Sequence, residues 1–242
     1  MNILALDTAS RTLSVALRAG EETWYTEVDA GMRHSELLMD LCGGLLNSAG
    51  LEPSGLGGLL CMKGPGSFTG LRIGFAAVKG IALGLNIPWA AVPTLDCMAR
   101  PHTGRPAFVL PVIDARKKSF FTALYKTNAA APELLTGYLD IDAAGISRLV
   151  TQYVTNEKMP VLLAGPDGEL LKKQLKDFLP GDLFSLLHVD PRGGRGNARE
   201  LLEIAIEQNI LEQKKGKPAD EEGPMYLRKS DAELNLQSAA NC

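Results

Sequence analysis

Apolar and polar positions along the chain follow an order of strands and helices that occurs twice. From His34 to Ala49, apolar residues recur at intervals of three and four, which predicts a helix. A buried strand at Leu59–Met62 leads through a glycine-rich turn into a second helix that ends near Leu85. Three β-rich runs precede these elements and predict strands at Ile3–Asp7, Thr12–Leu17 and Thr23–Val28.

The second half of the chain starts in the same way. Asp142 is placed to cap a helix that ends near Val154, and a strand at Val161–Ala164 and a helix at Gly168–Leu179 come next. Three runs predict the strands before that helix, at Phe108–Asp114, Ser119–Tyr125 and Leu134–Ile141. Both halves therefore have the order strand, strand, strand, helix, strand, helix.

The segments that join and end the two halves are less regular. We expect a strand at Pro88–Val92, a helical turn at Thr94–Arg100 and a linker at Pro101–Pro106. Near the end, a strand is predicted at Phe184–Val189, and Asn197 with Glu200 resembles a capping box that starts a helix ending near Leu211.

The repeat is also visible in residues, because a shift of 107 positions aligns Ile3–Asp7 with Leu110–Asp114. A duplicated unit of this order predicts an α/β fold with two lobes of the actin-like, ribonuclease-H-like kind, although two unrelated α/β halves also fit. We expect a first lobe at 1–105, a second at 106–219, and a segment at about 220–242 that packs back on the first.

Composition narrows the class of protein. Apolar residues make up 45% of the 242 positions and the net charge is −3, which is typical of an ordinary globular protein without a strong field for nucleic acid. Cys42, Cys61, Cys97 and Cys242 lack CxxC spacing, and the longest uncharged stretch contains two prolines. We therefore expect reduced thiols, no membrane helix and a cytoplasmic location.

The turn after the first strand of each half is the candidate nucleotide cleft. Actin-like ATPases place an acidic residue, glycine and a hydroxyl there, so that backbone N–H groups reach phosphate oxygens. This chain has Asp7 and Ser10 with alanine in place of the glycine, and Asp114 in the second half. The turn predicts a degenerate cleft, or two aspartates that bond to their own turns.

A glycine loop leads from the strand at Leu59–Met62 into the next helix. It matches neither the phosphate P-loop nor the GxGxxG pattern, yet its N–H groups at a helix start are suited to an anion. Anion binding, partner contact and simple turn geometry remain open for its residues, which are Gly64, Gly66, Ser67, Thr69 and Arg72.

The helix at Leu71–Leu85 carries only Arg72 and Lys79 as charges, so it needs burial on nearly every side. Another subunit supplies that burial, or a sheet and a neighbouring helix of the same chain do. Ala76, Gly80 and Gly84 share a face that allows close packing, and the helix containing Gly43-Gly44 is the expected companion.

Other chemistry finds little support in the residues. The three histidines are far apart, no HExxH or GxSxG motif is present, and no metal site is expected. The basic run Arg192–Arg199 fits either RNA contact or a loop before a helix.

Several motifs nevertheless resemble one known family. The segment Gly64–Gly74, GPGSFTGLRIG, is the most specific of them, and the chain start ILALDTAS, His34–Leu38 and Pro224–Arg228 are also similar. Together they resemble the bacterial TsaB (YeaZ) family, most strongly over residues 1 to about 125.

The resemblance implies an actin-like, two-lobe dimerisation subunit of the complex that makes threonylcarbamoyladenosine in tRNA. The family's catalytic paralogue, TsaD, holds the metal and transfers the threonylcarbamoyl group, and the ATPase TsaE uses ATP. Laid on this chain, the paralogue's two metal histidines fall on Thr94 and Met98. Activity of its own is therefore not expected, and tRNA is met through the partner.

The resemblance also places the partner surface on the two helices His34–Ala49 and Gly70–Leu85, which would form a four-helix contact with TsaD or, without it, a homodimer. The expected interface residues are Leu38, Leu41, Cys42, Leu45, Gly70, Ile73, Gly74, Ala77, Gly80, Ile81 and Gly84. An ATP hydrolase or small-molecule kinase of the actin-like class is the alternative, and a peptidase or protease regulator ranks last.

Overall fold

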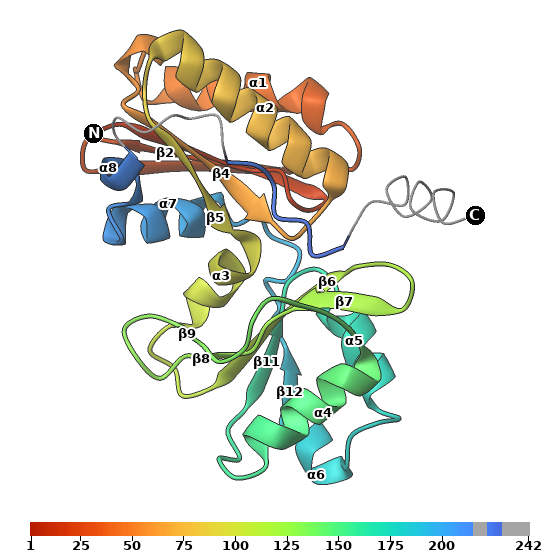
Figure 1. Ribbon diagram of the computed structural model, residues 1–242. Helices are drawn as coiled ribbons and strands as arrows, with labels where there is room; N and C mark the ends of the chain where they lie inside the picture. The colour runs from red at the N-terminus through yellow and green to blue at the C-terminus, as the bar shows by residue number, and fades with distance from the viewer. Residues whose placement is uncertain (215–221, 229–242) are drawn as a thin grey trace.

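The computed structural model describes residues 1–214 and 222–228, which form two α/β lobes stacked on one another (Figure 1). The first lobe contains a mixed sheet in the order β3-β2-β1-β4-β5, with β1 antiparallel to β2 and parallel to β4. Its strands are β1 (Ile3–Asp7), β2 (Thr12–Ala19), β3 (Glu22–Asp29), β4 (Gly58–Gly64) and β5 (Trp89–Pro93).

Two helices, α1 (His34–Ser48) and α2 (Phe68–Leu85), cover the outer face of this sheet, and a 3₁₀ turn at Pro53–Gly55 follows α1. Side chains alternate along β1, so Leu4 and Leu6 pack in one core cluster with α1 and α2. Ile3 and Ala5 point to the opposite face and join a second cluster.

α2 has the length and hydropathy of a membrane-spanning helix, with 18 residues and a mean hydropathy of 1.4. Its inner side chains Leu71, Phe75, Val78 and Ala82 are instead buried in the lobe. Helix α2 is thus a packing helix of a folded lobe, and its remaining apolar surface faces outward.

The second lobe repeats the strand order of the first, as β10-β7-β6-β11-β12, with the same parallel and antiparallel pairs. This equivalence confirms the predicted duplicated, actin-like fold. Its elements are β6 (Phe108–Asp114), β7 (Ser119–Thr122), β8 (Tyr125–Lys126), β9 (Glu133–Leu134), β10 (Leu139–Asp142), α4 (Ala143–Val154), β11 (Val161–Ala164), α5 (Gly168–Leu175), α6 (Gly181–Phe184) and β12 (Leu187–Val189).

Several predicted elements of the second lobe are shorter or broken. The single strand predicted at Ser119–Tyr125 is two, because Ala123 and Leu124 are both buried and the Leu124 N–H leaves the ladder to donate to Thr136 Oγ1 at 3.0 Å. The strand predicted at Leu134–Ile141 is likewise divided into β9 and β10, the helix after β11 stops at Leu175, and Phe184 belongs to α6.

Two helices connect the cores of the lobes. Helix α3 (Thr94–Ala99) leaves β5 and packs Leu95 and Met98 with the second sheet's Val109 and Ile113. After β12, the chain returns and α7 (Ala198–Glu207) covers the inner face of the first sheet, where it shares a cluster with Ile3 and Ala5.

The predicted boundary of the second lobe is therefore wrong beyond β12. Helices α7 and α8 (Ile210–Lys214) belong to the first lobe, because their apolar residues complete its inner core. Of the predicted C-terminal segment, the structure describes residues 222–228, which contact both lobes; the rest lies outside the described residues.

Two crossing segments join the lobes. The first passes through a 3₁₀ turn at Arg100–His102, and the second runs over 190–197. His102 Nε2 lies 3.1 Å from Asp190 Oδ2, and both residues are buried, so the two crossings are joined to each other. The basic residues of the second crossing face carboxylates: Arg192 pairs with Glu200 at 3.2 Å.

Candidate functional site

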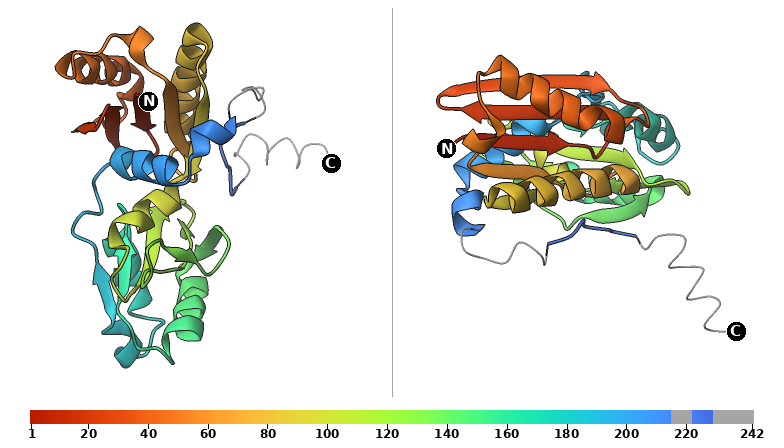
Figure 2. Two further views of the ribbon diagram at one scale, coloured as in Figure 1. Left: turned by 90° about the vertical axis from the view of Figure 1, so that its left-hand side faces the viewer. Right: turned by 90° about the horizontal axis from the view of Figure 1, so that it is seen from above.

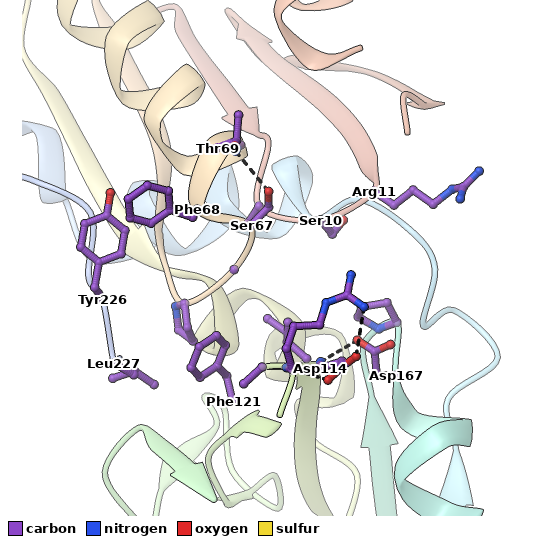
Figure 3. Close-up of a pocket in the computed structure, with 18 of the residues that line it drawn as sticks. Ser10, Arg11, Ser67, Phe68, Thr69, Asp114, Phe121, Asp167, Tyr226 and Leu227 are labelled. Carbon is purple, nitrogen blue, oxygen red and sulfur yellow. Dashed lines mark hydrogen bonds and ion pairs between the residues drawn. The ribbon is translucent and has the colours of Figure 1, made fainter. Parts of the chain in front are cut away.

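A cleft of about 880 Å³ separates the lobes (Figure 3). The β1–β2 turn and the start of α2 line it from the first lobe, and the β6–β7 turn with Asp167 lines it from the second. Residues 222–228, which we call the strap, contribute Met225 to Arg228 to its wall.

Asp7, expected in this cleft, lies beneath it. The side chain is 1% exposed and is not among the lining residues. Its Oδ1 accepts the N–H of Ala9 at 2.9 Å, as expected of an aspartate that bonds to its own turn. Its Oδ2 accepts the N–H of Asn197 at 2.7 Å. Burial raises the pKa of this carboxyl, and the two backbone N–H bonds oppose that rise.

The Asp7 bond also replaces the predicted capping box at α7. The Asn197 side chain makes no cap hydrogen bond, and the next N–H, that of Ala198, donates to Ser14 Oγ at 3.1 Å. Side chains from β1 and β2 thus cap a helix that follows them by almost the whole chain.

Ser10 and Asp114 do line the cleft. Ser10 Oγ donates to the Thr12 carbonyl at 3.3 Å, and Asp114 Oδ1 accepts the Arg116 N–H at 2.8 Å. Both side chains therefore bond within their own turns. The three predicted cleft residues do not converge on one point, since Asp7 is turned toward α7.

Sequence reasoning missed Asp167 in the opposite wall. Its Oδ2 accepts the backbone N–H of Asp114 at 2.7 Å, and burial raises the pKa of its carboxyl. The repeat contained a signal for it, because Gly165-Pro166 stands after β11 where Gly64-Pro65 stands at the end of β4, and both glycines have positive φ.

The glycine loop brings α2 against the β1–β2 turn. A Cβ on Gly66 would lie 2.6 Å from the Ala9 carbonyl oxygen, and one on Gly70 would strike the Thr8 carbonyl. Gly64 has a φ of 103°, and a Cβ there would lie 2.7 Å from the Met225 carbonyl oxygen of the strap. Close backbone approach therefore explains these glycines, which favours the turn-geometry interpretation.

The polar residues of the loop have distinct positions. Ser67 caps α2 by accepting the Gly70 N–H on its Oγ at 3.2 Å. Phe68 and Thr69 are exposed at the cleft, and the Arg72 guanidinium lies 3.9 Å from the centre of the Phe68 ring. Figure 3 shows the Phe68 ring facing that of Tyr226.

No group of three or more histidine, cysteine or acidic residues gathers at a metal-binding distance within residues 1–214 and 222–228. Thr94 and Met98 lie on α3 and are buried, at 0% and 4% exposed. Cys42, Cys61 and Cys97 are free thiols in the core, and burial raises the pKa of each.

The predicted partner helices α1 and α2 lie together on the outside of the first lobe (Figure 2). The structure corrects the list of their interface residues, because five of them point inward. Leu38, Cys42 and Leu45 belong to the core beneath α1, and Gly70 and Gly74 pack against Thr8. Leu41, Ile73, Ala77 and Ile81 are half-buried, and Gly80 and Gly84 are exposed.

Exposed residues of the same helices complete a surface that we call the outer helix face. Leu83 is 85% exposed and Met39 is 55% exposed, although both are large and apolar. Gly44, Gly80 and Gly84 have no atom within 4 Å of where a Cβ would stand. The sequence signal was the helical spacing of Ala76, Gly80, Leu83 and Gly84, which marks the side opposite the core.

Comparison with known proteins decides the family. The tRNA threonylcarbamoyladenosine biosynthesis protein TsaB of Bacillus subtilis is 31% identical over 237 residues, which cover 96% of both chains. The chain belongs to the TsaB family. The TsaB of Escherichia coli is 35% identical over 129 residues, which cover 52% of this chain and 55% of that protein. The chain therefore has a role in tRNA threonylcarbamoyladenosine biosynthesis.

Two further likenesses bear on this TsaB-family chain. The family model for TsaD, tRNA N6-adenosine threonylcarbamoyltransferase, matches residues 28–141, a region that contains both α1 and α2. A Pseudomonas aeruginosa protein described as similar to peptidase YEAZ has a TM-score of 0.77 and 24% identity, over 94% of this chain and 99% of that one. The latter likeness confirms the fold.

Proposed function

We propose that this TsaB-family chain is a non-catalytic scaffold that binds and activates a TsaD-type catalytic paralogue in threonylcarbamoylation of the adenosine next to the tRNA anticodon. A TsaE-type ATPase works with the pair. ATP and the metal belong to these partners, and tRNA reaches the complex through the catalytic subunit. The observation that carries the proposal is the outer helix face.

This face has the properties of a helix-packing surface without its partner. Covering an exposed leucine such as Leu83 contributes about 2 kcal/mol, and the neighbouring glycines allow another backbone to approach closely. Gly43 and Gly44 each lower helix stability by roughly 0.5–1 kcal/mol, and no close neighbour in the described chain requires them. A partner helix that packs closely on the two glycines explains why they stand in α1.

The TsaD model match supports the identity of that partner. It spans α1 and α2, so the paralogue is expected to carry equivalent helices. Two related helix pairs can then form a four-helix contact, and the same geometry lets two copies of this chain form a homodimer when the paralogue is absent.

The residues at the expected nucleotide and metal positions support a non-catalytic role. Asp7 has both oxygens engaged in structural hydrogen bonds, and buried Thr94 and Met98 stand where the paralogue's histidines are expected. A hydroxyl and a thioether do not make the imidazole site that the transferase chemistry needs.

Reconstitution with purified subunits tests the function. The modification rate of tRNA should require this chain in addition to the TsaD-type and TsaE-type proteins. A full rate from the other two subunits alone would exclude the scaffold role.

A Gly80→Arg substitution tests the surface. Nothing lies within 4 Å of the added Cβ, so the variant should fold, while the guanidinium blocks close helix packing. We expect loss of co-elution with the TsaD-type protein. Gly137→Arg, at an equally open and exposed glycine of the second lobe, is the matched control and should co-elute normally. Unchanged binding by Gly80→Arg would refute the placement.

A stand-alone actin-like ATP hydrolase or kinase is the second candidate, favoured by the 880 Å³ cleft with Ser67, Thr69 and Asp114 in its wall. Calorimetry with ATP and magnesium on the isolated chain separates the two. Tight binding would support the enzyme, and the scaffold proposal expects no measurable heat.

A further inference from the structure

We infer that the strap, residues 222–228, is a latch that holds the two lobes together across the cleft and fixes the width of its opening. The strap passes beside β4 of the first lobe and reaches the β6–β7 side of the second (Figure 1). Its two ends are fastened to different lobes by unlike contacts.

The first-lobe anchor combines backbone and ring contacts. The Met225 N–H donates to the Lys63 carbonyl at 2.7 Å, at the end of β4. A Cβ at Gly64 would lie 2.7 Å from the Met225 carbonyl oxygen, so the glycine there makes room for the strap. Glu222 pairs with Lys63 at 3.4 Å and with Lys214 at 2.8 Å.

Tyr226 continues this anchor on α2. Its ring lies 4.9 Å from that of Phe68, centre to centre, and its hydroxyl oxygen accepts a hydrogen bond from Arg72 Nε at 3.2 Å. Both partners belong to the first turns of the helix that also carries the outer helix face.

The second-lobe anchor is the side chain of Arg228. Nε and Nη2 donate to the two oxygens of Asp140 at 2.7 and 2.8 Å, which is the bidentate arrangement of an arginine and a carboxylate. Nη1 donates to the Ala115 carbonyl at 3.0 Å, and Nη2 also donates to Ser119 Oγ. The guanidinium thus joins the β6–β7 turn and β10.

The strap lies where its contacts can restrain movement between the lobes. The 190–197 crossing lies on one side of the molecule and the strap on the other, as Figure 2 shows. Lobes joined on one side are expected to move relative to each other unless a further contact prevents it. The Arg228–Asp140 pair supplies that contact, and releasing it lets the lobes open about the crossing segments.

Distance measurement between spin labels on the full-length chain tests the latch. Labels at Asn47→Cys on α1 and Gln152→Cys on α4 occupy exposed positions in different lobes, and Cys242→Ser removes the thiol outside the described residues. The remaining cysteines are buried with raised pKa, so they react slowly with the label.

Arg228→Gln and Asp140→Ala break the same pair from opposite sides. Each is expected to shift the distance distribution outward and to broaden it. Arg148→Gln, at an exposed arginine of α4, is the control and should leave the distribution unchanged.

The latch would be overturned if, for either variant, the distance distribution superimposed on that of the labelled chain with Arg228 and Asp140 in place. Loss of the native circular dichroism spectrum in both variants would overturn it too, because a latch between finished lobes is not required to fold them. The measurement contains no partner protein, so its outcome is independent of the proposed scaffold function.

Discussion

At the scale of single residues, Asp7 joins two parts of the chain that lie 190 positions apart. A carboxylate that ends the first strand is predictable from the sequence, and so is its bond to its own turn. Its second bond, to the start of α7, is not predictable, because only the folded chain brings Asn197 to β1. The same limit applies to Arg228, whose acceptors come from the β6–β7 turn and from β10.

Asp7→Ala should destabilise the protein. Two buried N–H groups, those of Ala9 and Asn197, lose their acceptor, and each such loss is worth about 1–3 kcal/mol. We expect urea denaturation to give a free energy of unfolding lower by at least about 2 kcal/mol, with Asp7→Asn intermediate. Asp114→Ala, at the equivalent strand end, is the control and should lose less than about 1 kcal/mol, because its turn is exposed. Equal losses at both positions would contradict this role of Asp7.

His102 should make stability depend on pH. Burial lowers the pKa of its ring below the ordinary 6.5, against the attraction of Asp190. As the pH falls through 6.5, the unfolded chain takes up this proton before the folded chain does, so the free energy of unfolding decreases. His102→Gln should flatten this dependence between the two pKa values, and His188→Gln, at an exposed histidine, should not. Denaturation curves at several pH values measure the difference.

At the scale of elements, periodicity located the first lobe's helices and strands, because alternation and helical spacing report which side is buried. It failed where local rules compete with tertiary contacts. β7 and β8 separate at two consecutive buried residues, and α7 begins at Ala198 without the side-chain cap expected from Asn197. The predicted interface residues include Leu38, which is buried, and leave out Met39, which is 55% exposed, because apolar character alone does not show which side of a helix faces the core.

The glycine pair in α1 gives an element-scale prediction. Gly43→Ala and Gly44→Ala place a methyl in open space within a helix, so each should raise the free energy of unfolding by about 0.5–1 kcal/mol. Thermal and urea unfolding of the isolated chain measure the gain. Gly74→Ala, where a Cβ would lie 2.5 Å from Thr8 Oγ1, should instead destabilise α2. Destabilisation by both α1 variants would mean that α1 has an unseen close neighbour.

At the scale of the whole molecule, the repeat predicted two lobes, but it did not reveal the exchange of helices between them: α7 returns to the first lobe, and α3 packs against both. Local hydrophobic runs predict the order of the strands along the chain. Which sheet the last helix covers depends instead on the direction in which the chain crosses between the lobes. Ala198 and Leu201 of α7 share a cluster with Ile3 and Ala5 for this reason.

Fragments of the chain test this exchange. Residues 1–107 lack α7, so their sheet exposes an apolar inner face, and we expect the fragment to aggregate or to bind a hydrophobic dye. Adding a peptide of residues 192–214 should suppress dye binding, while a scrambled peptide of the same composition should not. A fragment that is monomeric and cooperatively folded by itself would contradict the assignment of α7 to the first lobe.

The exchange of α7 also sets an order of events during synthesis. The amino-terminal lobe emerges from the ribosome first, yet it cannot close its core until the chain has been made through Glu207. At about 5–20 residues per second, its inner sheet face stays uncovered for roughly 5–20 s while the other lobe is translated. During that interval the nascent chain is expected to depend on chaperones that bind apolar β-strands.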